Sequence, residues 1–142
     1  MSLLGEVEVM DDLKRKAKEV LRGIPFVNLL KMELADIEVG EATLELSVRD
    51  ELRQPQGLLH GGAISSLIDT ATAFAAATVL VDGEKAFTAN LTVHFLRSVR
   101  NGKVICKARV IKQGKRLITV LADVFDDSDE IVATAITTYS RN

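Results

Sequence analysis

The stretch GGAISSLIDTATAFAAATVLV, residues 61–81, is almost entirely uncharged, and its only charged side chain is Asp69. It is nearly long enough to cross a bilayer, which takes about 20 apolar residues. An aspartate near the middle of a membrane helix costs roughly 2.5 to 3.5 kcal/mol on the insertion scale, and serines and threonines add further polarity. Because the flanking segments have the pattern of soluble strands, we expect a fully buried helix of a soluble protein and no membrane partner.

The segment before this helix alternates with period two. The alternation is clearest in EATLELSVR, residues 41–49, where the apolar side chains all face one way. Gly40 is expected to turn a first strand, beginning near Lys31, into a second one. Residues 50–60 contain Pro55 and Gly57 and show no periodicity, so they are expected to form a loop.

Four alternating segments follow the helix, at residues 84–98, 103–112, 115–126 and 130–140. Turn signals separate them. One long apolar helix with about six antiparallel strands that share an apolar face predicts an α+β fold, in which the sheet wraps around the helix.

The chain length allows one sizeable core. With 142 residues and 47% apolar composition, we expect a single domain over 1–142. Within it, Leu13, Ala17, Val20 and Leu21 have helical spacing, so residues 10–22 predict a short helix that Gly23 and Pro25 close. Residues 1–24 would then be an N-terminal helical extension.

Cysteine and histidine usage restricts the chemistry. One cysteine, Cys106, cannot form a disulfide within the chain, and acidic residues precede any apolar run long enough for a signal peptide, so a cytoplasmic location is expected. The two histidines, His60 and His94, are too few for a tri-histidine zinc site, and no HExxH or CxxC spacing occurs. We therefore expect no metal site.

Charge is distributed unevenly along the chain. The net charge is −2, yet residues 97–116 hold eight basic side chains and no acidic one, so this segment is +8 and the remainder is −10. One interpretation is a pair of strands with solvated lysines on their outer face. The alternative is an anion site. Aromatic residues make up 4% of the chain and none lies between Arg97 and Arg116, so platforms for stacking bases are missing and a phosphorylated small ligand fits better than nucleic acid.

The junction between loop and helix carries the most specific motif. It reads QPQGLLHGG, residues 54–62, and Asp69 follows nine residues after His60. Glycines let a ligand approach the backbone, and the unpaired amides at a helix start can hold developing negative charge. The simpler interpretation is that Gly61-Gly62 only allows a tight turn into the helix.

Asp69 has two interpretations as well. A lone carboxylate in an uncharged helix must find hydrogen bonds or face a cleft, because unpaired burial is costly. It is either structural or a general base or nucleophile. A Ser-His-Asp triad is disfavoured, since no GxSxG elbow occurs and Ser65 and Ser66 are ordinary helix positions.

The motif with its acid resembles the PaaI-type acyl-CoA thioesterases of the hotdog-fold superfamily. Their pattern is an amide residue, two others, glycine, two others and His-Gly-Gly, with an acid nine residues past the histidine. FTANLTVHFLRS (87–98) and VIKQGKRLITVLADVFD (110–126) are also similar to this family, so the resemblance covers roughly residues 25–140. It implies a hotdog fold, in which an antiparallel sheet wraps around one long helix.

The resemblance also implies roles for individual residues. The Gly61 amide would bind the thioester oxygen, His60 would orient the loop, and Asp69 would attack the carbonyl or activate water. Gln54 stands where many relatives have Asn, and Thr88 where relatives often place a Ser or Thr near the reacting water. Ala73 replaces a Thr of some aromatic-substrate members, whereas His94 receives no role and Cys106 is expected to be a small core residue.

The resemblance further implies ligand and partner. Coenzyme A would be part of the substrate, so no separate cofactor is expected, and its groove would contain Arg97, Lys112, Gly114, Lys115 and Arg116. The protein would be a homodimer with shared active sites, assembled into a dimer of dimers. Two alternatives remain open: a hydratase or dehydratase that acts on acyl thioesters, and a non-catalytic acyl-CoA-binding module. The identity of the acyl group does not follow from the sequence.

Overall fold

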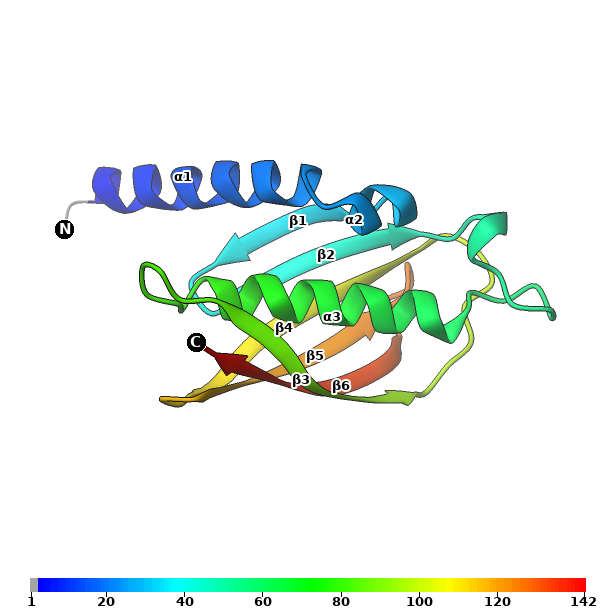
Figure 1. The fold of residues 1–142 in the computed structure, drawn as a ribbon. Helices are drawn as coiled ribbons and strands as arrows, with labels where there is room; N and C mark the ends of the chain where they lie inside the picture. The colour runs from blue at the N-terminus through cyan, green and yellow to red at the C-terminus, as the bar shows by residue number, and fades with distance from the viewer. Residues whose placement is uncertain (1–2) are drawn as a thin grey trace.

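Six antiparallel strands form one sheet that curls around a central helix (Figure 1). The computed structural model describes residues 3–142. In chain order the elements are α1 (Leu3–Arg22), α2 (Pro25–Leu30), β1 (Glu33–Glu38), β2 (Glu41–Ser47), the 3₁₀ helix η1 (Asp50–Leu52), α3 (Gly61–Ala77), β3 (Ala86–Phe95), β4 (Lys103–Gln113), β5 (Leu117–Phe125) and β6 (Ile131–Arg141). The sheet order is β1-β2-β4-β5-β6-β3. The predicted α+β fold is therefore confirmed.

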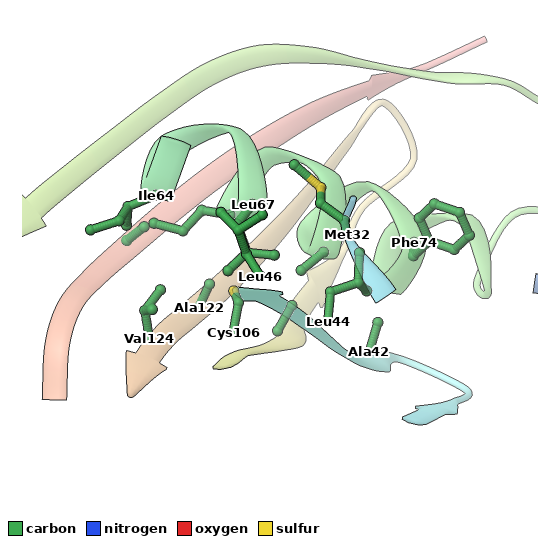
Figure 2. Packing of buried hydrophobic residues seen from close by; sticks show 14 of the residues in the cluster. Met32, Ala42, Leu44, Leu46, Ile64, Leu67, Phe74, Cys106, Ala122 and Val124 are labelled. Atoms are coloured by element: carbon green, nitrogen blue, oxygen red, sulfur yellow. The ribbon is translucent and has the colours of Figure 1, made fainter. Parts of the chain in front are cut away.

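The core lies between α3 and the concave face of the sheet. Figure 2 shows side chains of the strands, among them Leu46, Cys106 and Ala122, gathered under Leu67 of the helix. These four residues are almost fully buried. Because burial of a large apolar side chain stabilises the fold by about 1.5–3 kcal/mol, this interface supplies much of the driving force for folding.

Only one side of α3 is buried by this sheet. Nine of its residues are buried, and the others are half-buried or exposed: Gly61, Gly62, Ser65, Ser66, Asp69, Thr70, Ala73 and Ala77. The expectation of a fully buried helix is thus wrong. Its cause is compositional, because glycine, alanine, serine and threonine occupy both faces and hide the amphipathic pattern.

The two edges of the sheet differ. Helix α1 packs against β1, where Lys14 forms an ion pair with Asp36 at 2.9 Å. Strand β3 pairs with β6 on one side, and within residues 3–142 no strand pairs with its other side. Most of its side chains are exposed, including Phe87 (56%) and Phe95 (54%). A long exposed edge strand with unpaired backbone groups is a template for pairing with another chain.

Several boundaries differ from those predicted. The helix expected over 10–22 begins at Leu3, and Pro25 begins α2 instead of only ending α1, because proline suits the first position of a helix. The expected loop 50–60 contains η1 and a bridge between Arg53 and Leu59. Helix α3 ends at Ala77, and none of the described helices is both long and apolar enough to span a membrane.

The buried thiol of Cys106 offers a test of this packing. Desolvation, with a smaller contribution from Asp123, raises the pKa of the thiol to about 12. Because the thiolate is the reactive form, we expect Cys106 to resist a disulfide-exchange reagent at pH 8 in the native protein and to react fully in denaturant. Rapid labelling of the folded protein, measured by the absorbance of the released chromophore, would contradict this packing.

Candidate active site

The first turn of α3 leaves one backbone amide without an acceptor. His60 caps the helix: its Nδ1 accepts a hydrogen bond from the Gly62 N–H at 2.7 Å. Its carbonyl oxygen accepts from the N–H groups of Ala63 and Ile64 at 2.9 and 3.4 Å. Among the described hydrogen bonds none uses the N–H of Gly61, the first residue of the helix. This donor is therefore available to a ligand, and the helix dipole favours a negatively charged one.

Side-chain rings lie close to both glycines of this turn. A Cβ at Gly62 would lie 2.9 Å from Nδ1 of His60, and one at Gly61 would lie 3.3 Å from the ring of Phe95. Neither glycine has a positive φ. The motif is therefore more than a permissive turn, because two rings crowd the backbone there.

Asp69 lies two turns further along, on the half-buried side of α3. Its Oδ1 accepts hydrogen bonds from the hydroxyl groups of Thr88 (2.8 Å) and Tyr139 (3.2 Å). None of the described residues donates to its Oδ2. One carboxylate oxygen is thus held while the other is free to act on a ligand. Thr88 reaches this carboxylate from β3, where the ladder shifts register between Thr88 and Asn90.

Tyr139 belongs to this cluster, and sequence analysis missed it. Its hydroxyl also contacts the main-chain oxygen of Asp69 at 2.8 Å and Oγ1 of Thr72 at 2.7 Å. The side chain is 1% exposed, and burial, followed by the charge of Asp69, raises the pKa of the phenol well above its usual value. Tyr139 therefore remains a neutral hydrogen-bond donor. The sequence signal was slight: it is the only tyrosine of the chain.

The loop before α3 is held by its own side chains. Oε1 of Gln54 accepts from the N–H groups of Gln56 (2.5 Å) and Leu58 (3.3 Å), so Nε2 is the part of this amide that remains for a ligand. The guanidinium of Arg53 donates to the carbonyl oxygens of Gly57 and Arg100 at 2.7 and 2.5 Å. These bonds fix the loop to the segment that follows β3.

The basic segment does not form a single patch in one chain. Lys103 pairs with Glu45 at 2.8 Å, Lys107 lies 5.4 Å from the centre of the Phe125 ring, and Arg109 is paired in register with Glu41. For these three the solvated-face interpretation holds. The four basic residues that were predicted to line the coenzyme A groove are exposed and form no ion pair among the described residues: Arg97, Lys112, Lys115 and Arg116.

These four residues lie at opposite ends of the sheet. Arg97 follows the end of β3 that pairs with Ala133, whereas the β4–β5 hairpin of Lys112, Lys115 and Arg116 lies beside Arg141. Eight strand residues separate Ala133 from Arg141, which at about 3.3 Å per residue is about 26 Å. Within one chain, Arg97 and the hairpin cannot contact one phosphate group.

Polar anchors fix the hairpin. Arg141 donates from Nη1 to the carbonyl oxygen of Gly114 at 2.9 Å and from Nε to Glu84 at 3.1 Å. A Cβ at Gly114 would lie 2.8 Å from the carbonyl oxygen of Leu117, so the tight turn itself requires glycine. Lys115 and Arg116 therefore project from a turn of defined position.

Two further residues that the sequence singled out, Ala73 and His94, lie outside the hydrogen-bonded cluster around Asp69. Ala73 lies one turn after Asp69 on the same unburied side of α3. His94 lines a shallow hollow with Leu121 and Ile136 on the outer face of the sheet. Within residues 3–142, no three His, Cys, Asp or Glu side chains gather closely enough to hold a metal ion.

Gly61 and Asp69 lie apart within one chain. Gly61 and Asp69 are eight residues apart, which at 1.5 Å per residue separates them by about 12 Å along α3. One chain thus holds the unused amide at one place and the carboxylate with its free Oδ2 at another.

Comparison with known proteins places this arrangement in a family. Residues 56–133, more than half of the chain, match the model of the thioesterase superfamily. A Saccharolobus solfataricus protein, provisionally named an esterase, is 30% identical over 126 residues, which cover 87% of this chain and 82% of the relative. The 1,4-dihydroxy-2-naphthoyl-CoA hydrolase of Listeria monocytogenes is 28% identical over 101 residues, with coverage of 71% and 82%.

The fold has a close structural counterpart. The PaaI protein of the Escherichia coli phenylacetic acid degradation operon superposes with a TM-score of 0.85 at 22% identity, over 94% of this chain and 95% of that one. The matched family model spans the QPQGLLHGG motif from Gln56 onwards, as well as Asp69 and Thr88. The chain therefore belongs to the thioesterase superfamily and has the PaaI-type hotdog fold that its motifs predict.

Proposed function

We propose that the protein is an acyl-CoA thioesterase that hydrolyses an acyl- or aryl-acyl-CoA to the free acid and coenzyme A. The unused Gly61 amide is the observation that carries this function. His60 satisfies every other amide of the first turn, so a single donor is left for an oxyanion. Asp69, with one oxygen held and one free, supplies the second requirement of thioester hydrolysis.

In the proposed reaction Oδ2 of Asp69 either removes a proton from water or attacks the thioester carbonyl directly. The carbonyl oxygen becomes negatively charged and accepts the hydrogen bond of the Gly61 N–H. The C–S bond then breaks and the new C–O bond remains. If water attacks, the product is the free acid, and the proton taken from water passes to the departing thiolate. If Asp69 attacks, the product is a mixed anhydride, which a water molecule then hydrolyses to the free acid and the Asp69 carboxylate, and the proton released by that water neutralises the thiolate. Thr88 and Tyr139 keep the carboxylate in place, and Nε2 of Gln54 is positioned to orient the water or the thioester.

We infer that two chains share each active site. An oxyanion donor must lie near 3 Å from the reacting oxygen, so a 12 Å separation along one helix is too large. A two-fold axis that packs two α3 helices antiparallel through their unburied faces would set Gly61 opposite Asp69 of the partner subunit, twice per dimer. The open edge of β3 supports this assembly, since the same axis would let the two sheets join there.

The same axis would reunite the separated basic residues. An antiparallel arrangement carries the β4–β5 hairpin of the second chain to the Arg97 end of the first chain. Coenzyme A phosphates could then contact Lys115 and Arg116 from one chain beside the Gly61 turn of the other. This supports the predicted groove, which a single chain does not form.

The two alternatives agree less well with the contacts. An acyl-thioester hydratase typically pairs an acid with a histidine, yet Nδ1 of His60 is used as the cap of α3. A non-catalytic module needs no carboxylate with a free oxygen near the oxyanion amide. Release of free thiol from a panel of acyl-CoAs tests the proposal directly, because only a thioesterase produces it.

Asp69→Asn keeps the shape of the side chain and removes the base or nucleophile. We expect kcat to fall by about a hundredfold or more with little change in KM. Asp123→Asn is the matched control, because Asp123 also accepts a hydrogen bond from a threonine, Thr134, but on the outer face of the sheet. If kcat of Asp69→Asn falls by less than about threefold, the role of the carboxylate is structural.

The hairpin is tested by replacing both Lys115 and Arg116 with alanine. We expect KM for acyl-CoA to rise several-fold and its salt dependence to weaken, while kcat with a short thioester that lacks the nucleotide stays nearly unchanged. The double variant Lys107→Ala with Arg109→Ala removes the same charge from the outer face and should leave KM near that of the native protein. Equal KM values for the two double variants would mean that Lys115 and Arg116 are solvated surface residues that do not contact coenzyme A.

Sharing of the site is tested by mixing two inactive variants, Asp69→Ala and Gly61→Pro. Proline removes the amide at a position where helix starts tolerate it, and the half-exposed Phe95 ring can yield to the added atoms. In a mixed dimer one site receives both defects and the other receives none. With random exchange, half the dimers are mixed and roughly a quarter of the native activity should return. No recovery, despite folded variants and demonstrated subunit exchange, would mean that each site is built within one chain.

A further inference from the structure

A groove of about 260 Å³ lies beside the first turn of α3. Its apolar walls come from three elements: Phe26 and Leu30 of α2, Leu52 of η1, and Ala63 of α3. His60 and Gly62, the residues directly before and after Gly61 in sequence, also line it, whereas Gly61 itself does not. The groove therefore begins within one residue of the place where the thioester carbonyl is proposed to bind.

The polar side chains of the groove are already hydrogen-bonded. Arg53 donates to two carbonyl oxygens and to Asp50, and Ser66 donates to the carbonyl oxygen of Gly62 at 2.7 Å. The carboxylate of Glu51 pairs with Arg49 at 2.8 Å and lies at the exposed rim. Polar and apolar atoms both line the groove, and because most of the polar ones are already bonded within the protein, we expect a ligand to gain more from contact with the apolar side chains.

One apolar side chain of the groove, that of Phe26, lacks cover, whereas Leu52 and Ala63 are buried. Phe26 is 51% exposed although its helix packs on the protein. Helix α2 is held in place from outside the groove, because Arg49 donates to the carbonyl oxygen of Leu29 at 2.6 Å and to Glu51 of η1. The wall is thus preformed, and an occupant would bury the Phe26 ring without having to order it first.

We propose that this groove binds the acyl group of the substrate and selects a short aliphatic chain or a single ring over acetyl. The inference rests on the proposed function, since it takes the Gly61 amide as the position of the carbonyl. The groove volume lies below the roughly 300–1,000 Å³ of pockets that hold drug-sized ligands, which limits the occupant to a small group. Phe26 is the residue that we expect to set this preference.

A second apolar hollow does not meet the same requirement. It is lined by Leu13, Val20, Phe74 and Ala77 and lies at the other end of α3. Ala77 is sixteen residues from Gly61, or about 24 Å along the helix. An acyl chain whose carbonyl is held at Gly61 would not reach this hollow of the same chain. In the proposed dimer, Ala77 in the hollow of the partner subunit lies about 12 Å beyond its Asp69, a distance longer than a short acyl chain.

The test compares two non-hydrolysable thioethers, S-hexyl-CoA and S-ethyl-CoA, by calorimetry. A buried methylene contributes about 0.8 kcal/mol, or about fourfold in affinity, and the groove is open, so we expect the native protein to bind S-hexyl-CoA about tenfold or more tightly. Phe26→Ala should reduce this ratio several-fold, and Phe26→Asp should abolish most of it. Unchanged affinity for S-ethyl-CoA in the same variants shows that they are folded and still bind coenzyme A.

Leu29 provides the matched control. It lies on the same helix, is 68% exposed and does not line the groove. Leu29→Ala and Leu29→Asp change apolar area and charge in the same direction as the Phe26 variants. We nevertheless expect them to keep the native ratio of the affinities for S-hexyl-CoA and S-ethyl-CoA. A native protein without preference for the hexyl group, or equal ratios in the Phe26 and Leu29 variants, would overturn the inference.

Parallel hydrolysis assays separate the two proposals. With hexanoyl-CoA and acetyl-CoA as substrates, the Phe26 variants should lower kcat/KM for hexanoyl-CoA alone. If the native protein prefers S-hexyl-CoA through Phe26 but releases thiol from neither substrate, the groove stands and the thioesterase proposal fails. If it releases thiol from both substrates and the Phe26 variants do not change the ratio of kcat/KM for hexanoyl-CoA to that for acetyl-CoA, the thioesterase proposal stands and the groove proposal fails.

Discussion

Asp69 is the only charge on a helix that a curled sheet buries along one side. An unpaired carboxylate in an apolar interior costs several kcal/mol, so the helix can enter the sheet only with Asp69 outside the apolar core, where Thr88 of β3 and Tyr139 of β6 donate hydrogen bonds to it. That orientation of the helix places Ile64, Leu67 and Ile68 in the core. It also fixes which small residues remain uncovered on the other side. A single electrostatic constraint therefore determines the packing of α3 and the face that it presents.

Asp69 and strand β6 stabilise each other through Tyr139. Tyr139 of β6 is buried, and its hydroxyl needs partners there, which the main-chain oxygen of Asp69 and the hydroxyl of Thr72 provide. In return Tyr139 and Thr88 give Asp69 the hydrogen bonds that its half-buried position requires. Because the donors come from β3 and β6, the orientation of the carboxylate depends on the register of two strands. The site is thus held by the fold and not by its own helix alone.

The sequence predicted the parts of the fold that depend on local pattern. Period-two alternation located the strands, and Gly40 marked a turn that the structure contains between β1 and β2. Helix α2 was missed because Pro25 ends one helix and begins the next, and a single proline does not distinguish these roles. The burial of α3 was overestimated because small residues occupy both of its faces.

Long-range contacts were harder to predict, for a physical reason. Tyr139 is 70 residues from Asp69, and nothing in the alternation of β6 indicates which buried side chain meets the carboxylate. The +8 segment was visible as a charge count, yet strand alternation and hairpin position divide it among an outer face and two ends of the sheet. Charge along the sequence becomes a binding surface only through the three-dimensional arrangement.

Three incomplete features of the single chain have one geometric solution. Gly61 and Asp69 are too far apart on α3, Arg97 and the β4–β5 hairpin lie at opposite ends of the sheet, and the outer side of β3 has no partner strand within residues 3–142. A monomeric protein could contain any one of these features. However, a two-fold axis beside β3 and perpendicular to α3 exchanges the two ends of the molecule, so it would remove all three at once. Because the uncovered face of α3 and the open edge of β3 come from different parts of the sequence, their agreement on one axis is the strongest argument for a shared site.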